Sequence, residues 1–323
     1  MDRAALYHNS GRSGPSWHNR LVDEAGVQII NVSVAASPVP GTGSLACICG
    51  TDCPEAVWAD LAAEIRKSLD GKALVSLANR IKRAEIAEEV LASGKADLII
   101  LGRALICDPE FLVKIAEDRE SDIRRCASCS YCIATMMDGN PAACMQNPMM
   151  GHEGEYDLSV PAPEKKKVVV AGGGPAGMQA AVVCARRGHD VVLMEGSDRL
   201  GGTINVAMMP PFKYEVGTVC ENFSNEIRKY GVNVKVNTCA DKETVLAEKP
   251  DAVIVATGTV PLRPPIPGLD QDNVYTAEAV LQGKVKAEGK TVVIGGGVVG
   301  METADFLLEQ GNEIIVIEML LHS

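Results

Sequence analysis

Four cysteines near the middle of the chain have the residue type and spacing to hold one soft-metal centre. Two residues separate Cys126 from Cys129, two more separate Cys129 from Cys132, and eleven precede Cys144. Thiolates spaced in this way reach one centre without long backbone detours, and they suit zinc and iron–sulfur clusters. The spacing differs from the two-plus-two layout of a zinc ribbon and lacks the histidines of a zinc finger. A structural zinc ion stays open as an alternative.

A glycine-rich turn in the second half of the chain predicts a dinucleotide site. The apolar run 167–171 leads directly into Gly172, Gly174 and Gly177 and then into an alanine-rich stretch. Glycines at this spacing let the backbone approach a pyrophosphate at the positive N-terminus of a helix. A second apolar run ends in Glu195, about twenty residues on, where a carboxylate would accept the ribose hydroxyls.

The same pattern occurs a second time near the end of the chain. The apolar run 290–294 leads into Gly295, Gly297 and Gly300, and a following apolar run ends in Glu318. Two such patterns in one chain are much stronger than one, and the second is predicted to bind NAD(P)H. A carboxylate at Glu318 would accept the ribose 2′-hydroxyl and repel a 2′-phosphate, which favours NADH and leaves NADPH possible.

The first 122 residues alternate short apolar runs with helical periodicity, which predicts βα units around a parallel sheet. Such repeats can belong to a barrel or to an open sheet. A further helix is expected to start with Asp108 as its N-cap and Pro109 in its first position. The other expected elements are strands at 27–35, 73–78 and 97–102 and helices at 54–69 and 84–93.

Two stretches of this region resemble the last strands of the barrel of old yellow enzyme, the NADH:flavin oxidoreductase family. They are Asn79-Arg80-Ile81 and residues 96–105 with the Asp108-Pro109 pair. In that family the loops after the last two strands bind the FMN phosphate at the C-terminal face of a TIM barrel. The resemblance therefore implies FMN-phosphate contacts at Arg80, Gly102 and Arg103. Without the resemblance to this family, an arginine that follows a strand is more often a solvated surface residue.

The cysteine segment also resembles a known site. With Arg125 before it and Asn147-Pro148 after it, it is similar to the 4Fe-4S site of 2,4-dienoyl-CoA reductase and trimethylamine dehydrogenase. The resemblance implies that the ligands of a 4Fe-4S cluster are Cys126, Cys129, Cys132 and Cys144.

One loop departs from the pattern of that family. The dienoyl-CoA reductase branch carries a histidine associated with proton transfer there, whereas residues 36–53 contain none. No catalytic residue can therefore be assigned. Without a histidine or a fourth ligand, Cys47, Cys49 and Cys53 are predicted to be spare thiols rather than metal ligands.

The stretch 199–213 closely resembles the FAD domain of the same reductases, so the first glycine turn is expected to bind FAD. The implied FAD contacts are Ala176, Glu195, Thr203 and Lys213. Residues 256–258 resemble the Ala-Thr-Gly motif of flavoproteins with two dinucleotide domains. Small residues such as Gly258 let the chain pass close to a bound cofactor there.

These predictions give an α/β protein with the C-terminal part of a TIM barrel, a cysteine segment and Rossmann-type domains. A barrel cannot close with three strands, and ~250 residues are typical for one. The last unit also stops after one βαβ start, so the chain is expected to be an internal fragment of a protein about twice as long. The predicted parts are a partial FMN barrel at 1–125, an iron–sulfur segment at 126–148, a linker at 149–164, an FAD domain at 165–289 and the start of an NAD(P)H domain at 290–323.

Composition and charge indicate which classes of binding partner and which cellular compartment to expect. A net charge of −11 argues against a nucleic-acid partner. The first residues lack a signal pattern, and no apolar run approaches the ~18 residues that span a bilayer, so no membrane partner and a cytoplasmic location are expected. In the cytoplasm the eleven cysteines of the chain would be reduced thiols, available for metal or redox chemistry. A small-molecule substrate is expected, and homo-oligomer formation stays open.

Three functions are compatible with the sequence. The resemblance implies an enzyme in which electrons pass from NADH through FAD, a 4Fe-4S cluster and FMN to an activated C=C bond of an enoate or a dienoyl-CoA. The second hypothesis is an amine dehydrogenase of the trimethylamine dehydrogenase type, which the intact second glycine pattern disfavours. The third is a non-catalytic electron-transfer or cofactor-binding fragment.

Overall fold

The computed structural model describes residues 15–33 and 48–320. The chain forms two compact units, residues 1–156 and 157–323, and the division falls inside the stretch predicted as a linker. Cys47 and the end of the strand predicted at 27–35 lie outside the described residues.

The first unit is built on a small parallel sheet. Its strands β1 (Ile29–Val32), β2 (Leu74–Leu77) and β3 (Leu98–Ile99) lie in the order β1-β2-β3, with Ile30 beside Val75 and Ser76 beside Leu98. Buried side chains of β2 pack with those of helix α2 (Ala59–Leu69), because the apolar residues of α2 recur on one face. The parallel α/β arrangement predicted for this region is confirmed. The other helices of the sheet region are α1 (Pro15–Ala25) and α3 (Ala84–Ala92).

The predicted start of one helix was wrong. Helix α5 (Phe111–Ala116) has Glu110, not Asp108, as its N-cap. The buried Asp108 carboxylate keeps a local bond, since its Oδ1 accepts from the Glu110 amide at 3.1 Å, while its Oδ2 accepts from the Arg124 amide at 2.7 Å and from Lys114 Nζ at 2.6 Å. Asp108 therefore bonds to the turn before α5 with one oxygen and to Lys114 and the Arg124 amide with the other. The remaining elements of this unit are α4 (Arg103–Cys107), the 3₁₀ turn Glu120–Asp122 and α6 (Tyr131–Met137).

Helix α2 is also shorter than predicted. It starts at Ala59 rather than Pro54, since the chain before it forms a turn in which Ala56 has a φ of +50°. A left-handed residue at that position interrupts any helix that would begin earlier.

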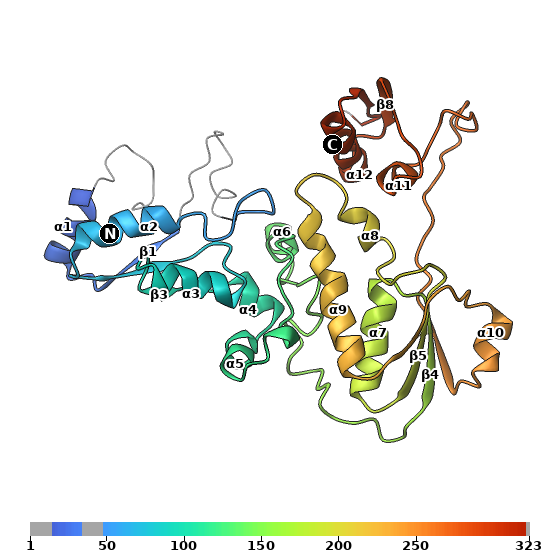
Figure 1. Ribbon diagram of the computed structural model, residues 1–323, viewed down its shortest axis with the longest axis horizontal. Helices are drawn as coiled ribbons and strands as arrows, with labels where there is room; N and C mark the ends of the chain where they lie inside the picture. Colours follow the sequence, from blue (N-terminus) through green and yellow to red (C-terminus); the bar gives the residue numbers. More distant parts are fainter. Residues whose placement is uncertain (1–14, 34–47, 321–323) are drawn as a thin grey trace. The chain divides into compact units, whose positions relative to one another are not determined.

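The second unit contains a four-stranded parallel sheet in the order β6-β5-β4-β7. Helices α7 and α9 cover one face, and α10 packs on the other through Val245, which contacts Val169, Val192 and Met194 (Figure 1). Strands β4 and β5 read as almost continuous apolar runs because both of their faces are buried. The elements are β4 (Lys167–Ala171), α7 (Pro175–Arg186), β5 (Asp190–Met194), α8 (Ile204–Ala207), α9 (Thr218–Lys229), β6 (Asn233–Lys235), α10 (Lys242–Ala247) and β7 (Ala252–Val255).

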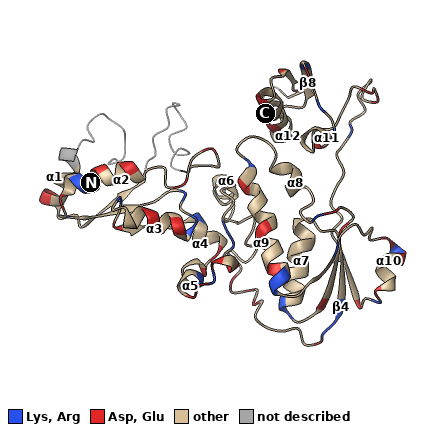
Figure 2. Ribbon diagram, in the orientation of Figure 1, with Lys and Arg blue, Asp and Glu red and all other residues tan. Residues whose placement is uncertain are grey.

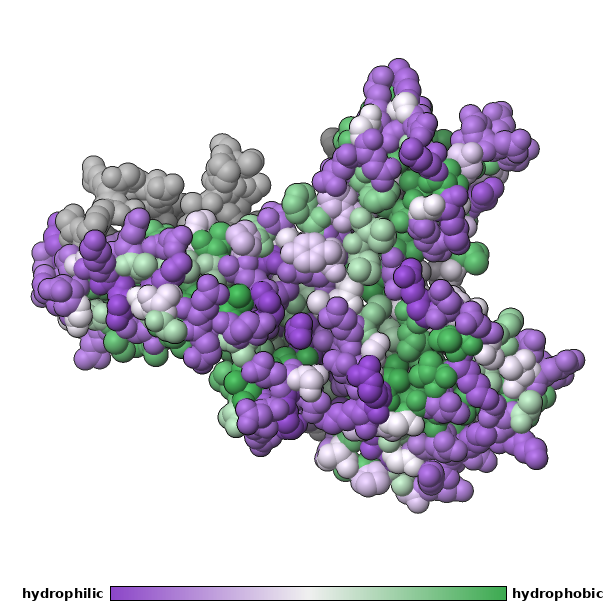
Figure 3. All heavy atoms as spheres, viewed as in Figure 1, coloured by the Kyte–Doolittle hydropathy of each residue, from purple (hydrophilic) through white to green (hydrophobic). Residues whose placement is uncertain are grey.

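A smaller parallel pair follows in the same unit. Strands β8 (Lys290–Ile294) and β9 (Glu313–Ile317) are joined by α12 (Val298–Glu309), and α11 (Ala277–Leu281) precedes them. Alternate side chains of β8 are exposed, among them Val292 and Ile294. In the space-filling view, exposed apolar side chains interrupt the polar surface of the molecule (Figure 3).

Charged side chains are spread over the helices rather than gathered into one basic surface. Helix α3 is acidic, and α9 carries both signs (Figure 2). Within residues 15–33 and 48–320, no helix is both long enough and apolar enough to cross a membrane.

The centre of the larger sheet supplies a stability test. Leu193 on β5 is fully buried, whereas Leu246 on α10 is 57% exposed. We expect Leu193→Ala to lower the free energy of unfolding by about 2–5 kcal/mol, because it removes buried apolar contacts and leaves a cavity. Leu246→Ala should change it by less than about 0.5 kcal/mol. Urea unfolding followed by circular dichroism measures both, and equal effects would contradict the assigned core.

A charged bridge in the same unit supplies a pH test. Glu248 accepts hydrogen bonds from Lys235 on β6 and from Lys167 on β4, and these bonds hold the pKa of its carboxyl below the ordinary value. Its stabilising contribution is therefore complete above the unfolded pKa of about 4.3 and is lost as the pH falls through the lower folded pKa. We expect Glu248→Gln to lower the thermal midpoint at pH 7, with a difference that shrinks in acid. Glu243→Gln on the same helix is the control, and a difference independent of pH would contradict the bridge.

Candidate functional site

The first glycine turn is dictated partly by packing inside the protein. Gly172 has a φ of +110°, and a Cβ there would lie 2.2 Å from the carbonyl oxygen of Ala256. A Cβ on Gly177 would lie 1.8 Å from the carbonyl oxygen of Gly172. Only glycine tolerates these contacts, so β4, the turn and α7 are held close together, against the small residues that follow β7.

Gly174 needs a different explanation. It is the N-cap of α7, with the ordinary extended angles φ −71° and ψ 179°. A Cβ on Gly174 would meet no heavy atom of the described chain within 4 Å. Neither the backbone nor packing therefore requires glycine there. The room beside the first turn of a twelve-residue helix is where a pyrophosphate binds, so the turn fits a dinucleotide.

Glu195 lies at the end of β5 beside this turn. Its Oε2 accepts a hydrogen bond from the Gly173 amide at 2.7 Å, and its Oε1 accepts bonds from the Ser197 amide and hydroxyl, both at 2.8 Å. Burial raises the pKa of the Glu195 carboxyl, but these hydrogen bonds outweigh it and hold the pKa below its ordinary value. The predicted ribose acceptor is thus an anionic acceptor that also braces the turn.

The second turn repeats this geometry. Gly295 has a φ of +105°, and a Cβ on Gly300 would lie 1.9 Å from the Gly295 carbonyl oxygen. Gly297 is the N-cap of α12, with φ −70°, ψ 177° and no heavy atom of the described residues within 4 Å of an added Cβ. Glu318 Oε2 accepts a hydrogen bond from the Gly296 amide at 2.6 Å. The two predicted patterns therefore form the same local structure.

The other predicted FAD contacts are distributed around the first turn. The loop before α8 packs on the turn, since the Gly201 amide donates to the Gly173 carbonyl at 2.9 Å. Thr203, at the end of this loop, is the N-cap residue of α8. Ala176 is exposed in the first turn of α7. Gly258 has a φ of +75°, which favours glycine.

Lys213 has a partner that the sequence did not indicate. Its Nζ lies 2.6 Å from Oε1 of Glu302 on α12, so this side chain is engaged in an ion pair with the helix of the second turn. The pair joins the loop after α8 to the second dinucleotide pattern.

In the first unit, Arg80 and Arg103 converge on one turn. The buried Arg80 guanidinium donates to the Gly50 carbonyl, and Arg103 Nη2 donates to the Cys49 carbonyl at 2.8 Å. Gly102 precedes Arg103 as the N-cap of α4, and an added Cβ would meet no described atom within 4 Å. The three residues are therefore brought together. Two guanidinium forks at one turn suit a phosphate group.

The thiols of Cys49 and Cys53 form a pair beside this turn. Burial and a hydrogen bond with Cys49 raise the pKa of the Cys53 thiol to about 11. Asn79 Nδ2 also donates to the Cys49 sulfur at 3.3 Å. The assignment of these thiols as non-ligands stays a prediction.

The four cysteines of the central segment lie within electrostatic range of one another. Burial is the main cause that raises the pKa of Cys126, Cys129 and Cys132, and neighbouring thiols of the set add to it. In the part of the chain that the structure describes, no three histidine, cysteine or acidic side chains converge tightly enough to hold a single metal ion. Four cysteines are the donor set of a 4Fe-4S cluster and also that of a structural zinc site.

Cationic side chains that sequence reasoning missed surround these thiols. Arg103 lowers the pKa of Cys126 and Cys132, and its Nη1 donates to Ser130 Oγ at 3.4 Å. The buried Lys82 donates from Nζ to the Cys126 carbonyl at 3.3 Å. Positive charge close to a thiolate offsets the free-energy cost of burying that negative charge. No sequence spacing links these residues to the cysteines.

Cys144 has the most hydrogen-bond donors of the four. Its pKa is lowered to about 6, first by a hydrogen bond with the thiol of Cys107 and then by the amides of Gln146 and Asn147. Cys107 lies outside the predicted spacing, so nothing in the sequence pattern pointed to it. Its own pKa is raised, because the same hydrogen bond and its burial favour the protonated thiol.

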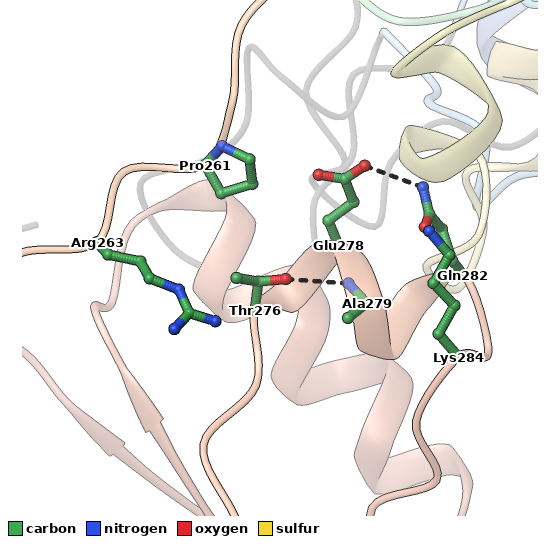
Figure 4. Close-up of a pocket in the computed structure, with 7 residues that line it drawn as sticks. All are labelled: Pro261, Arg263, Thr276, Glu278, Ala279, Gln282 and Lys284. Atoms are coloured by element: carbon green, nitrogen blue, oxygen red, sulfur yellow. Dashed lines mark hydrogen bonds between the residues drawn. The ribbon is translucent and has the colours of Figure 1, made fainter. Parts of the chain in front are cut away.

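A small open cavity of about 250 Å³ lies elsewhere, between α11 and the segment before it. The Thr276 hydroxyl caps α11 by accepting from the Ala279 amide at 3.2 Å, and Glu278 accepts from Gln282 at 3.0 Å (Figure 4). None of the predicted site residues lines this cavity.

Comparison with known proteins agrees with this geometry. Residues 166–322 match the family described as pyridine nucleotide-disulphide oxidoreductase. The chain is 40% identical over 308 residues to the NADH oxidase of Thermoanaerobacter brockii, covering 93% of this chain and 46% of that protein. It is 40% identical over 243 residues to the cinnamate reductase of Clostridium sporogenes, covering 75% and 36%. A solved 2-naphthoyl-CoA reductase complexed with 2-naphthoyl-CoA superposes with a TM-score of 0.82 at 34% identity, covering 89% and 43%.

The fold and the two turns define an FAD- and NAD(P)H-binding module of the kind found in pyridine nucleotide-disulphide oxidoreductases. The chain belongs to the NADH:flavin oxidoreductases of the old-yellow-enzyme type, which confirms the resemblance found in the sequence. It spans a little less than half the length of the NADH oxidase and of the solved reductase.

The room at Gly174 gives a direct test of the first turn. We expect Gly174→Ala to lower the bound flavin per chain at least tenfold, because the added methyl group would occupy the space of the pyrophosphate. The thermal midpoint of the flavin-free protein should stay unchanged, since the methyl group meets no protein atom. Flavin absorbance and thermal unfolding measure the two effects.

Two other glycines provide the controls for this test. Gly154→Ala should leave both quantities unchanged, because that position is open and outside the turn. Gly177→Ala should destabilise the flavin-free protein itself, owing to the clash with Gly172. Normal flavin content in Gly174→Ala would contradict the assigned site.

Proposed function

We propose that this chain carries the electron-input part of an NADH-dependent flavoenzyme that reduces an activated C=C bond of the enoate or dienoyl-CoA type. The observation that carries the proposal is the second glycine turn, complete with Gly297 and Glu318, in the same chain as the four-cysteine segment. The intact second turn disfavours the alternative, an amine dehydrogenase of the trimethylamine dehydrogenase type. The names of two relatives, a cinnamate reductase and a 2-naphthoyl-CoA reductase, support this class of substrate.

The nucleotide at the second turn is proposed to be NADH. The pKa of the Glu318 carboxyl is held below its ordinary value by the amides of Leu320 and Gly296, so the side chain stays anionic at neutral pH. An anion at the end of β9 accepts ribose hydroxyls and repels a 2′-phosphate. At the first turn, Gly172, Gly174, Ala176, Gly177, Glu195, Thr203, Lys213 and Gly258 are proposed to surround FAD.

The cysteine segment is proposed to hold a 4Fe-4S cluster through Cys126, Cys129, Cys132 and Cys144. Arg103 and Arg124 lower the pKa of thiols in the set, and this helps anionic sulfur to persist in a buried place. When bound, flavins convert between two-electron and one-electron transfer, and such a cluster carries one electron at a time.

The first unit is proposed to be the last part of an FMN-binding TIM barrel. Three successive parallel βα units agree with this, and Arg80, Gly102 and Arg103 meet at one turn, where they would contact the FMN phosphate. The boundaries proposed for the parts are those expected from the sequence: barrel to residue 125, cluster segment to 148, linker to 164, FAD domain to 289 and NADH domain from 290.

Anaerobic purification of the full chain tests the proposal. We expect four irons and four sulfides per chain with bound FAD that NADH reduces, and, in the complete protein with the rest of the barrel, bound FMN and NADH-dependent reduction of an enoate such as cinnamate. Cys129→Ala should lose most of the iron, because one thiolate ligand is removed. Cys239→Ala removes an exposed thiol outside the segment and should keep the iron.

Three results would contradict parts of this account. Stoichiometric zinc in place of iron would identify a structural zinc site. Full iron content in Cys129→Ala would contradict the ligand assignment. In the complete protein, iron and FAD without FMN or enoate reduction would favour a non-catalytic electron-transfer role.

A further inference from the structure

Phe212 has an unusual backbone conformation in the loop between α8 and α9. Its φ is +60°, in the left-handed region that bulky side chains rarely adopt. Every other non-glycine residue with a positive φ in the described chain is alanine, serine, asparagine, aspartate, arginine or lysine. An aromatic residue in this conformation costs free energy, and such strain is found where a protein uses the side chain that it presents.

The turn around Phe212 explains the conformation but not the side chain. The Lys213 amide donates to the Pro210 carbonyl at 3.1 Å, which closes a four-residue turn with Pro211 in second place and Phe212 in third. A proline followed by a residue with a positive φ is the pattern of a type II turn, where the third residue is usually glycine or asparagine. The turn geometry alone therefore favours glycine over phenylalanine at this position.

Packing inside the protein does not account for the ring either. Phe212 is 57% exposed, whereas Pro210 at the start of the same turn is buried. The turn is nevertheless held in place, because Lys213, which closes it, forms an ion pair with Glu302 at 2.6 Å. The aromatic ring is thus presented at the surface by a fixed turn.

The loop that carries Phe212 is attached to both dinucleotide turns. At its start, the Gly201 amide donates to the Gly173 carbonyl of the first turn at 2.9 Å. At its other end, Lys213 reaches α12, the helix of the second turn. The nucleotides proposed for these turns both end in a planar redox ring, the isoalloxazine of FAD and the nicotinamide of NADH. Aromatic side chains pack favourably on such rings.

We propose that Phe212 is a stacking residue for the planar redox ring of a nucleotide bound at these turns, the flavin or the nicotinamide. The strained turn then serves to present the phenyl ring to it. This inference rests on the proposed function, because it needs FAD at the first turn and NADH at the second. Phe212 binds and positions the ring, and it takes no part in bond formation.

Three substitutions separate the strain from the aromatic ring. Phe212→Gly removes both, Phe212→Leu removes the ring and keeps the strain, and Phe212→Tyr keeps both. We expect the glycine and leucine variants to bind the stacked nucleotide about two- to tenfold more weakly, because an aromatic pair is lost. The thermal midpoint of the flavin-free protein should rise in Phe212→Gly, since glycine adopts a positive φ without strain. Phe212→Tyr should match the wild type in both quantities.

Two titrations of the full chain identify the ring that Phe212 contacts. FAD is added to the flavin-free protein and followed by its visible absorption spectrum, and NAD⁺ is added to the FAD-loaded protein and followed by calorimetry. Weaker FAD binding with an altered flavin spectrum assigns Phe212 to the flavin, and weaker NAD⁺ binding alone assigns it to the nicotinamide.

Lys249→Gly is the matched control for the release of strain. Lys249 is exposed, has a φ of +51° and follows α10, away from both dinucleotide turns. This variant should also raise the thermal midpoint, and it should leave the affinities for FAD and NAD⁺ unchanged.

The outcomes distinguish this inference from the proposed function. Unchanged affinities for FAD and NAD⁺ in Phe212→Gly and Phe212→Leu would overturn the role of Phe212 and leave the two nucleotide sites in place. A lower thermal midpoint of flavin-free Phe212→Gly would show that the ring is needed for packing, which would also overturn it. Wild-type protein that binds neither FAD nor NAD⁺ would overturn the proposed function and the inference with it.

Discussion

The second unit depends on a contact that only glycine allows. The carbonyl oxygen of Gly172 lies where a side chain on Gly177 would begin, 1.8 Å from an added Cβ, and Gly295 and Gly300 repeat the contact at 1.9 Å. This approach closes the turn between strand and helix and aims the helix N-terminus at the space beside Gly174 or Gly297. It also brings the amide of the middle glycine to the carboxylate at the end of the next strand, at 2.7 Å in one turn and 2.6 Å in the other. Because both turns reproduce the whole set of contacts, each has the geometry of a dinucleotide site.

The first unit depends on local positive charge in an acidic chain. The net charge is −11, yet Arg80 and Arg103 meet at the Cys49-Gly50 turn, and Lys82 reaches the cysteine segment. Arg103 touches both places, with one nitrogen on the Cys49 carbonyl and another on the Ser130 hydroxyl. It was predicted only as a phosphate contact, and the structure shows that it also links that turn to the thiols. One guanidinium therefore connects the proposed phosphate site with the proposed cluster site.

Local patterns were predictable and long-range pairings were not. Strands β4, β5, β8 and β9 and both glycine turns follow from apolar runs and glycine spacing, because these signals lie within a few residues. Asp108 was expected to cap a helix, and its Oδ1 accepts from the nearby Glu110 amide, but no local pattern reveals the bonds that its Oδ2 accepts from Lys114 and from the Arg124 amide. The pairing of Lys213 with Glu302 and that of Cys107 with Cys144 likewise join residues far apart in the sequence. Such partners become visible only when the fold brings them together.

The two turns share one geometry and are proposed to bind different nucleotides, FAD at the first and NADH at the second. Calorimetric titration of Gly297→Ala with NAD⁺, which cannot reduce the flavin, separates the two sites. We expect this variant to keep wild-type FAD content and to bind NAD⁺ at least about tenfold more weakly, a loss of about 1.4 kcal/mol. Unchanged NAD⁺ affinity, or loss of FAD from this variant, would contradict this assignment.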